Sequence, residues 1–532
     1  MFKHSDSYRR FCPGEEQITI SDAICLGRRR ANFHKCPGCQ FNDDEKGRPS
    51  YEATVVGQRH LPQAIKELPE EVPMIERVFK AYDVRATVPE PLNEDVAWRI
   101  GNGTAQFLRT SLTGYDRSDP DMNTLIVGRD MRKSSPALTK AFIDGAAATG
   151  ARIVDIGMID TSQIYFATNH LKCCGGATCT ASHNPPNYNG FKICGPKGKP
   201  IGADSGLKEI ERIAKAVARH AVTIREKTVT TDLSAPYREY IRQFMLEPRP
   251  LKVVVDASNG MAGRWFPIIF SNVPGMQVIP LNFEHTGEFV HPPNPLVPAN
   301  LAQLRAAVTE HGADFGACFD GDADRCIFVD EKARIVPCDL LTALLAQEYL
   351  RDYPGSAVVY DLRSSRVVQD VVLAGGGTPR RQRVGHVFMK RAMAEANGVF
   401  GGELSGHFYF RDFWYCDSGM LGFVAVVNAL TRGGKPLSQL LAPFEKYFAS
   451  GERNFENEDK DGTLDRLAKK YRDGELDRLD GVTVQYPRWW FNVRASNTEP
   501  LLRLNLEADS QDLLNEKLHE LEPLLGRPAV EH

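Results

Sequence analysis

Three segments of the chain repeat one pattern, a short apolar run that ends in an acidic residue and turn-forming residues. They are TLIVGRD at 124–130, LKVVVDASNG at 251–260 and SAVVYDLRSS at 356–365, and each precedes apolar residues at helical spacing. Strands that alternate with helices are typical of α/β units with largely parallel sheets. The sequence therefore predicts three related α/β domains.

The pattern changes near residue 450. GVTVQYP, WWFNVRAS and LLRLNLEA predict three strands in succession, and a final helix follows Ser510 as its N-cap. This order predicts a small C-terminal α+β domain. Several domains are expected in any case, because single hydrophobic cores stop growing near ~250–300 residues. We expect an N-terminal extension and four domains, with the limits 1–72, 73–228, 229–334, 335–447 and 448–532.

Composition excludes several classes of protein. Hydrophobic residues make up 42% and charged residues 25% of the chain, as in an average globular protein. No apolar run approaches the ~18 residues of a membrane-spanning helix, and the first residues lack the apolar stretch of a signal peptide. The net charge of −3 gives no electrostatic reason to expect nucleic acid or an anionic membrane as a partner. We expect a cytoplasmic protein.

The most specific motif is DGDADR at 320–325. Its carboxylates, Asp320, Asp322 and Asp324, are hard oxygen ligands suited to Mg²⁺ or Ca²⁺, and apolar strand-like runs flank them. Three carboxylates between buried strands are too costly without a cation. An EF-hand loop is excluded by Arg325 at its sixth position, which requires glycine, and by strands where helices are needed. We expect a divalent metal site.

Three further motifs are weak singly. TASHNPPNYNGFK at 180–192 surrounds Ser182 with small and turn-forming residues, so it suits either a rigid nucleophile loop or a plain surface loop. GELSGH at 402–407 offers hydrogen-bonding groups for sugar hydroxyls, although a simple turn would look the same. RASNTEP at 494–500 combines a guanidinium with hydroxyl and amide groups that suit a phosphate. Together the four motifs indicate phosphoryl transfer on a sugar phosphate.

These four motifs, in this order, resemble the signatures of the α-D-phosphohexomutase superfamily. FKAYDVR at 79–85, VVVDASNG at 253–260 and RVGHVFMK at 383–390 add to the resemblance, which runs from about residue 75 to the C-terminus. The Ser-Asn-Thr form of the last loop looks most like the phosphomannomutase/phosphoglucomutase branch. Ala323 and Ala86 stand where many members have glycine, and neither change removes a ligand. The resemblance implies four domains around a central cleft.

The resemblance also implies roles for individual residues. Ser182 would carry the phosphoryl group, and with Asp320, Asp322 and Asp324 it would hold Mg²⁺. Lys192, Arg325 and His407 would act in catalysis, with Lys192 and His407 as alternatives for proton transfer. The residues expected to bind substrate are Tyr82, Arg85, His183, His386, Glu403, Ser405, Arg494, Ser496, Asn497, Thr498 and Arg503.

The implied reaction interconverts hexose 1-phosphate and hexose 6-phosphate, with mannose or glucose as the sugar. It would pass through phosphoserine and a hexose 1,6-bisphosphate, which also serves as activator. A non-catalytic sugar-phosphate sensor is the alternative, and the intact Ser182 and the three aspartates count against it. We expect small-molecule sugar phosphates as partners and a monomer or homodimer.

The N-terminal extension lies outside the resemblance. Among Cys12, Cys25, Cys36 and Cys39, only the last two have the tight spacing of a metal knuckle. A Cys₄ zinc site is the leading functional interpretation and an iron–sulfur cluster is the alternative. Four unlinked thiols would give the same sequence, and the basic cluster 28–30 is interpreted as a solvated charge run.

Overall fold

Two compact units make up the chain, Met1–Val72 and Pro73–His532. The computed structural model describes residues 9–11, 19–21, 74–111, 119–219, 228–496 and 500–529. In the first unit, β1 (Arg9–Phe11) pairs antiparallel with β2 (Thr19–Ser21). The four predicted metal-binding cysteines of this unit, Cys12, Cys25, Cys36 and Cys39, lie outside the described residues.

The first sheet of the second unit has six strands in the order β3-β7-β6-β4-β5-β8. β6, β4, β5 and β8 run parallel, and β7 lies antiparallel to β6 and β3. Its strands are β3 (Val84–Thr87), β4 (Thr124–Arg129), β5 (Arg152–Met158), β6 (Gly175–Cys179), β7 (Tyr188–Cys194) and β8 (Val229–Thr230). Its helices are α3 (Met74–Val78), α4 (Glu94–Thr110), α5 (Ser135–Ala147), α6 (Thr161–His170) and α7 (Lys208–Ala216). β8 joins this sheet just past the predicted limit at residue 228, because its backbone pairs with β5.

The second and third sheets follow in sequence. The second has the order β10-β9-β11-β12 and the third the order β14-β13-β15-β16-β17. The second domain contains α8 (Ser234–Arg242), β9 (Leu251–Asp256), α9 (Ala262–Phe270), β10 (Met276–Leu281), α10 (Ala302–His311), β11 (Phe315–Phe319) and β12 (Cys326–Asp330). The third contains α11 (Cys338–Asp352), β13 (Ala357–Asp361), α12 (Arg366–Ala374), β14 (Thr378–Gln382), α13 (His386–Glu395), β15 (Phe400–Gly402), β16 (Phe408–Phe410), β17 (Cys416–Asp417), α14 (Gly419–Gly433) and α15 (Leu437–Leu441).

One topology recurs in these three sheets. The strand orders β5-β4-β6-β7, β10-β9-β11-β12 and β14-β13-β15-β16 each have three parallel strands and a final antiparallel one. In each unit an aspartate ends or follows the strand that comes first in the sequence, which is β4, β9 or β13. Its carboxylate accepts the backbone N–H of the residue two positions later, at 3.0, 2.9 and 2.8 Å. These aspartates are Asp130, Asp256 and Asp361. The prediction of three related α/β units is confirmed.

The C-terminal domain is built on an antiparallel sheet with the order β20-β21-β22-β23-β19-β24, and β18 also pairs with β23. Ser510 caps the last helix by accepting the N–H of Leu513, as the sequence predicts. The elements are β18 (Phe448–Ala449), β19 (Arg453–Glu456), α16 (Lys460–Lys470), β20 (Glu475–Asp477), β21 (Val482–Gln485), β22 (Trp489–Ala495), β23 (Leu501–Ala508), α17 (Gln511–Leu525) and β24 (Arg527–Pro528). The predicted α+β domain is confirmed.

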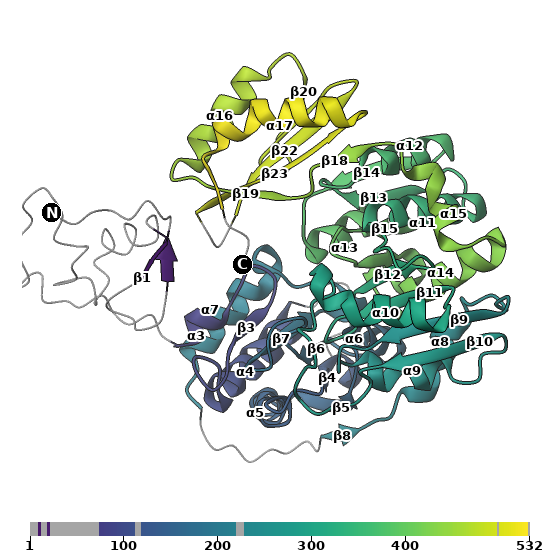
Figure 1. Ribbon diagram of the computed structural model, residues 1–532. Helices are drawn as coiled ribbons and strands as arrows, with labels where there is room; N and C mark the ends of the chain where they lie inside the picture. The colour runs from purple at the N-terminus through teal and green to yellow at the C-terminus, as the bar shows by residue number, and fades with distance from the viewer. Residues whose placement is uncertain are drawn as a thin grey trace, which may run out of the picture. The chain divides into compact units, whose positions relative to one another are not determined.

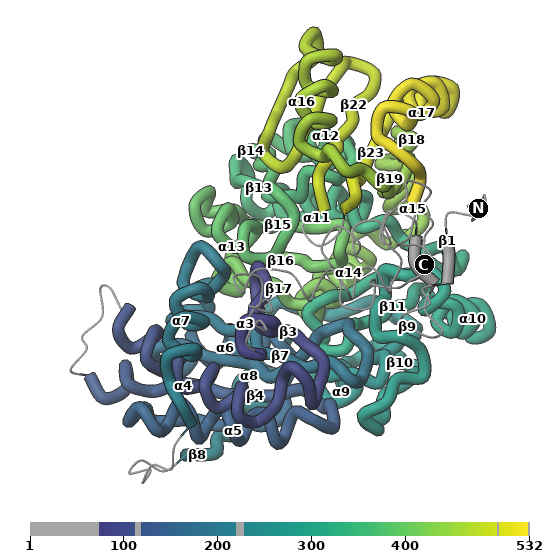
Figure 2. Tube along the Cα trace, turned by 90° about the vertical axis from the view of Figure 1, so that its left-hand side faces the viewer, coloured from purple at the N-terminus to yellow at the C-terminus, as the bar shows by residue number. Residues whose placement is uncertain are grey.

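The second and third sheets share one hydrophobic core, which holds Val253 and Phe315 of the former and Val358 and Phe400 of the latter. α14 contacts β12 of the second sheet and β16 of the third, and Figures 1 and 2 show it between them. The C-terminal domain has a separate core, between its sheet and α16 and α17. The loops that carry the motifs follow strands β6, β11, β15 and β22.

Candidate active site

Ser182 lies in the loop between β6 and β7, with only 1% of the residue exposed. Its hydroxyl donates to Asp320 Oδ2 at 2.8 Å, and its backbone has φ +50°. A non-glycine residue in this left-handed region is strained, and such strain is found where surrounding contacts hold a functional group in place. The serine loop and the aspartate loop, 138 residues apart in the sequence, therefore meet at one hydroxyl.

Arg132 binds the backbone of this loop, and sequence reasoning missed this residue. The guanidinium is buried, pairs with Asp130 at 3.1 Å, and donates to the backbone oxygens of Ser182 and Asn184 at 2.8 and 2.7 Å. It also donates to the carbonyl of Pro185 at 2.6 Å. The repeated aspartates offer a signal, since Arg132 stands two residues after Asp130, where the third domain also has an arginine.

The three aspartates of the loop between β11 and β12 are buried together. One oxygen of each lies within 4.8 Å of the others, and Oδ1 of Asp322 and of Asp324 has no hydrogen-bond partner in the described chain. Buried carboxylate oxygens without partners are costly unless a cation binds them, so this group fits Mg²⁺. Ala323 has φ +57°, a backbone conformation that favours glycine.

Lys192 supplies positive charge to this group. Its ammonium lies 2.7 Å from Asp322 Oδ2 and 2.5 Å from Asp324 Oδ2. Burial opposes ionisation of all three aspartates, but the charge of Lys192 lowers the pKa of Asp322 and Asp324 below the ordinary value. Burial and these two charged neighbours raise the pKa of Asp320. The same carboxylates outweigh burial at Lys192 and raise its pKa.

Two arginines and a histidine surround Ser182. Arg325 Nε lies 3.7 Å from Asp320 Oδ2, and Arg85 donates to Asn184 Oδ1 at 2.8 Å, which ties β3 to the serine loop. His183 Nδ1 lies 3.4 Å from the Ser182 hydroxyl. Burial and the charges of Arg325, Arg85 and Lys192 lower the pKa of His183 to about 2. The imidazole is therefore neutral and adds no charge beside the hydroxyl.

The sugar-loop residues Glu403, Ser405 and His407 lie between β15 and β16. Ser405 Oγ lies 2.8 Å from His407 Nδ1, and Tyr409, which sequence reasoning missed, donates to Glu403 Oε2 at 2.6 Å. His407 Nε2 is 3.4 Å from Asp324 Oδ1, so this loop reaches the aspartate loop. Burial lowers the pKa of His407, but Asp324 and Glu403 together outweigh burial and raise it to about 9. Burial raises the pKa of Glu403, but His407 and Tyr409 together with the backbone N–H of Gly385 lower it to about 2.

His386 and Tyr82 border this region from α13 and from the loop before β3. Their ring centroids are 6.1 Å apart, and those of His386 and His407 are 6.4 Å apart. Gly385 has φ +126°, and a Cβ there would stand 3.2 Å from the Tyr82 ring, so this approach favours glycine. Burial raises the pKa of Tyr82, and among the charges that act on it are those of Glu403 and Arg494.

The phosphate-loop arginines stand opposite each other on two strands. Arg494 of β22 and Arg503 of β23 are register partners, and both bind the carboxylate of Glu452. Ser496 is buried, and its carbonyl accepts from Lys460 Nζ at 2.9 Å. The other two predicted phosphate ligands, Asn497 and Thr498, lie outside the described residues.

Comparison with known proteins identifies the chain. Four family profiles named phosphoglucomutase/phosphomannomutase match it: alpha/beta/alpha domain I at 76–220, domain II at 235–333, domain III at 337–447 and the C-terminal domain at 452–523. The chain belongs to the phosphoglucomutase/phosphomannomutase family. The α-D-phosphohexomutase resemblance is thereby confirmed.

Relatives cover most of this family member. "Phosphohexose mutases" of Xanthomonas campestris pv. campestris is 39% identical, and the match covers 84% of this chain and 98% of that protein. A "Phosphomannomutase" of Escherichia coli is 37% identical over the same shares of the two chains. The crystal structure of a phosphoglucomutase/phosphomannomutase family protein from Burkholderia thailandensis is 32% identical, with a TM-score of 0.75, and covers 84% of this chain and 96% of that one.

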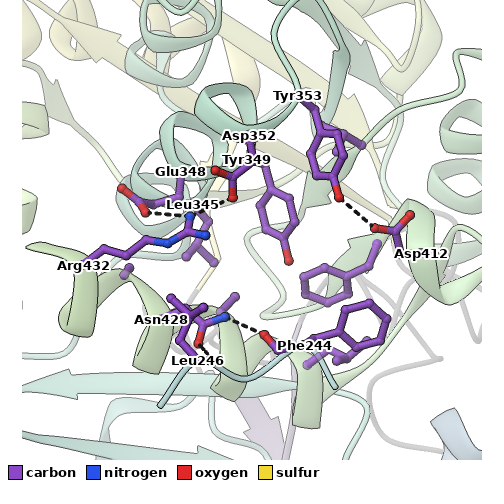
Figure 3. A pocket seen from close by; sticks show the side chains of 15 residues that line it. Phe244, Leu246, Leu345, Glu348, Tyr349, Asp352, Tyr353, Asp412, Asn428 and Arg432 are labelled. Carbon is purple, nitrogen blue, oxygen red and sulfur yellow. Dashed lines mark hydrogen bonds and ion pairs between the residues drawn. The ribbon is translucent and has the colours of Figure 1, made fainter. Parts of the chain in front are cut away.

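A cavity away from the family motifs lies between α11, α14 and the segment after α8, with a volume of about 160 Å³. Figure 3 shows Arg432, Asn428 and Tyr353 bound to other residues of the chain. Arg432 pairs with Glu348 and Asp352, and Asn428 bonds the backbone of Phe244 and Leu246. None of the predicted site residues lines it.

The described helices include none with both the length and the apolar character needed to cross a membrane.

Proposed function

We propose that the protein interconverts hexose 1-phosphates and hexose 6-phosphates of mannose and glucose through a phosphoserine at Ser182 and a hexose 1,6-bisphosphate. The observation that carries this proposal is the 2.8 Å contact between the Ser182 hydroxyl and Asp320, within the buried aspartate group. Relatives named phosphohexose mutases and phosphomannomutase support the same activity.

Asp320, Asp322, Asp324 and the phosphorylated Ser182 would hold Mg²⁺, because Oδ1 of Asp322 and of Asp324 makes no hydrogen bond among the described residues and carboxylate oxygens are ligands that the ion prefers. Bound there, the ion would neutralise charge on the phosphoryl oxygens. Arg325 and Lys192 add positive charge around Ser182 and would offset the repulsion between a phosphoserine and an incoming phosphosugar.

His407 is better suited to proton transfer than Lys192. Two carboxylates bind the Lys192 ammonium and raise its pKa, so it keeps its proton. The pKa of His407, about 9, is closer to neutral, and Ser405 and Glu403 place the ring within the sugar loop. Glu403 and Ser405 would read sugar hydroxyls, while Arg494, Ser496, Asn497, Thr498 and Arg503 would hold the non-reacting phosphate.

A coupled mutase assay on mannose 1-phosphate, glucose 1-phosphate and glucosamine 1-phosphate tests this function. We expect turnover of the first two after addition of a catalytic amount of hexose 1,6-bisphosphate. Excess chelator should abolish turnover, and Mg²⁺ should restore it better than Ca²⁺, because a site of three short carboxylates and one phosphate oxygen suits a small octahedral ion. Full activity in chelator would refute the metal assignment.

For the N-terminal extension we propose a zinc site formed by Cys12, Cys25, Cys36 and Cys39. The spacing of Cys36 and Cys39 supports it. Elemental analysis of the full chain and of a chain that lacks residues 1–72 should show about one zinc that depends on the extension. Iron in place of zinc would favour the cluster alternative. If neither metal is found, the four cysteines are unlinked thiols. Mutase activity should survive the deletion, since the four motifs lie elsewhere.

A further inference from the structure

Glu452 lies between β18 and β19, near the start of the C-terminal domain, and three arginines surround its carboxylate. Arg494 Nη2 is 2.6 Å from Oε2, and Arg503 Nη1 is 3.2 Å from Oε1. Arg363 of the third domain approaches Oε2 at 3.7 Å. One carboxylate thus occupies the two arginines that the proposed function assigns to the substrate phosphate.

The two arginines suit a phosphate better than a single carboxylate. Arg363 already forms a two-pronged pair with Asp361, at 2.8 and 3.2 Å, so its charge is largely satisfied. Glu452 brings one negative charge to Arg494 and Arg503 together. Arg494 Nε is also buried, without a hydrogen-bond partner among the described residues. A group with two negative charges and several acceptor oxygens would satisfy this pair better than a carboxylate does.

We propose that Glu452 is an internal substitute for the substrate phosphate: it occupies Arg494 and Arg503 in the ligand-free protein, and the entering phosphate displaces it. This inference rests on the proposed function of the phosphate loop. Guanidinium groups bind carboxylates and phosphates with the same two-pronged geometry, so the two anions compete for one place. A retained Glu452 would stand beside a phosphate dianion in a half-buried region, where like charges repel strongly.

The displacement has a use in a reaction whose intermediate must turn around. A bisphosphate that leaves Arg494 and Arg503, the phosphate clamp, would otherwise take its negative charge away from both guanidinium groups, which is costly in a partly buried place. Glu452 returns to them when the phosphate departs, so it lowers both the affinity of the clamp for phosphate and the barrier to release. The residue therefore tunes exchange of the two ends of the sugar and takes no part in the chemical step.

The Glu452→Gln variant tests this, because it keeps the shape of the side chain and removes its charge. Asp477→Asn is the matched control: Asp477 pairs with Arg381 at 2.6 Å, also between the third and C-terminal domains, but away from the clamp. Calorimetric titration of the full chain with inorganic phosphate, without Mg²⁺, gives the dissociation constant. We expect it to fall about 3- to 10-fold in Glu452→Gln, and to change less than about 2-fold in the control. An unchanged or higher constant in Glu452→Gln, or no detectable binding to it, would overturn the proposal.

Turnover gives an independent readout. Glu452→Gln should lower KM for glucose 1-phosphate and also lower kcat, because release becomes slower, whereas a merely structural loss would raise KM. Tighter phosphate binding in a protein that turns over no hexose phosphate would refute the proposed function and leave the role of Glu452 intact. Normal turnover with an unchanged phosphate constant would refute only the role of Glu452.

Discussion

The second and third domains share one core, whereas the C-terminal domain has its own and is joined to the third domain by polar contacts. Arg366 of α12 donates to the carbonyls of Tyr486 and Pro487, and Glu507 accepts the backbone N–H of Arg366. Exposing buried apolar surface to water costs much free energy. Hydrogen bonds between polar groups can be replaced by hydrogen bonds to water at a small net cost. The motif loops of the second and third domains thus rest on a shared apolar core, whereas the arginines proposed to bind phosphate belong to a domain held by contacts that water can replace.

Two side chains of the clamp differ from the aspartate group in the same way. The side chains of Asp322, Asp324 and Lys192 are at most 10% exposed, and that of Arg494 is 11% exposed. Those of Arg503 and Glu452 are 29% and 27% exposed. Buried charges that pair with one another are ordered before substrate arrives. Half-exposed charges can exchange one partner for another. Under the proposed function, this difference separates a preorganised chemical centre from a region that binds and releases the non-reacting phosphate.

Loss of the nucleophile should have the largest effect and leave phosphate binding unaffected. In Ser182→Ala we expect turnover to fall by about 10⁴-fold or more, because no other group takes its role in accepting the phosphoryl group. Peptide mass spectrometry should find phosphate on Ser182 of the wild type alone. Binding of inorganic phosphate, measured as above, should match that of the wild type. Near-normal turnover in this variant would remove Ser182 from the mechanism.

The sugar loop should act on both epimers alike. Mannose and glucose differ only at C2, and Glu403 and Ser405 are expected to read hydroxyls that the two sugars share. We expect kcat/KM for the two 1-phosphates to lie within about 100-fold, the range that a few weak contacts give. Glu403→Ala should depress both values in parallel. A variant that loses only one sugar, or a wild type with a stricter preference, would show that another residue reads C2.

Loosening the C-terminal domain should change binding more than chemistry. Arg366→Ala removes donors to Tyr486 and Pro487, so we expect KM to rise about 3- to 10-fold while kcat changes less. Arg351→Ala, which removes an exposed pair with Glu348, is the control and should change neither value by more than about 2-fold. A fall in kcat of Arg366→Ala as large as its rise in KM would mean that the C-terminal domain also orders the chemical centre.

The smallest effect should appear at the junction of the first two domains. Asp160 caps α6 and accepts from the Tyr237 hydroxyl of α8 at 3.1 Å, and burial raises its pKa to about 7. Between about pH 4 and pH 7 the folded protein therefore binds more protons than the unfolded chain, so the contribution of this residue to stability falls as pH rises. The free energy of unfolding of Asp160→Asn, relative to that of the wild type, should rise by about 1–2 kcal/mol between pH 4 and pH 7.

Thermal unfolding midpoints of the two proteins at pH 5 and pH 7.5 measure this difference. The midpoint of Asp160→Asn relative to that of the wild type should be higher at pH 7.5 than at pH 5. A gap that stays constant would show that Asp160 ionises normally in the folded protein. The variant keeps a good N-cap residue, so loss of the cap does not obscure the comparison.

Strands and motifs were predictable because their signals are local. Runs such as TLIVGR and AVVYD are apolar over the length of a buried strand, and DGDADR and TASHNP carry their chemistry in consecutive residues. Arg132, Tyr409 and Glu452 were not found, although each bonds a predicted site residue or its backbone. Isolated arginines, tyrosines and glutamates are common on any surface, and their roles depend on partners that lie far away in the sequence or come from another strand.

The sequence by itself determined which residue types meet and in what order: three repeated α/β units, a different C-terminal domain, a serine loop, three alternating aspartates and a basic phosphate loop. Only the tertiary structure decided their charges and partners. In the sequence Lys192 and His407 are equal alternatives for proton transfer; the fold places the lysine between Asp322 and Asp324, which supports the proposal that His407 transfers the proton. The reason is physical: hydrophobic periodicity is a property of neighbouring residues, whereas a pKa depends on burial and on charges within a few ångströms, which strand ends from different domains bring together.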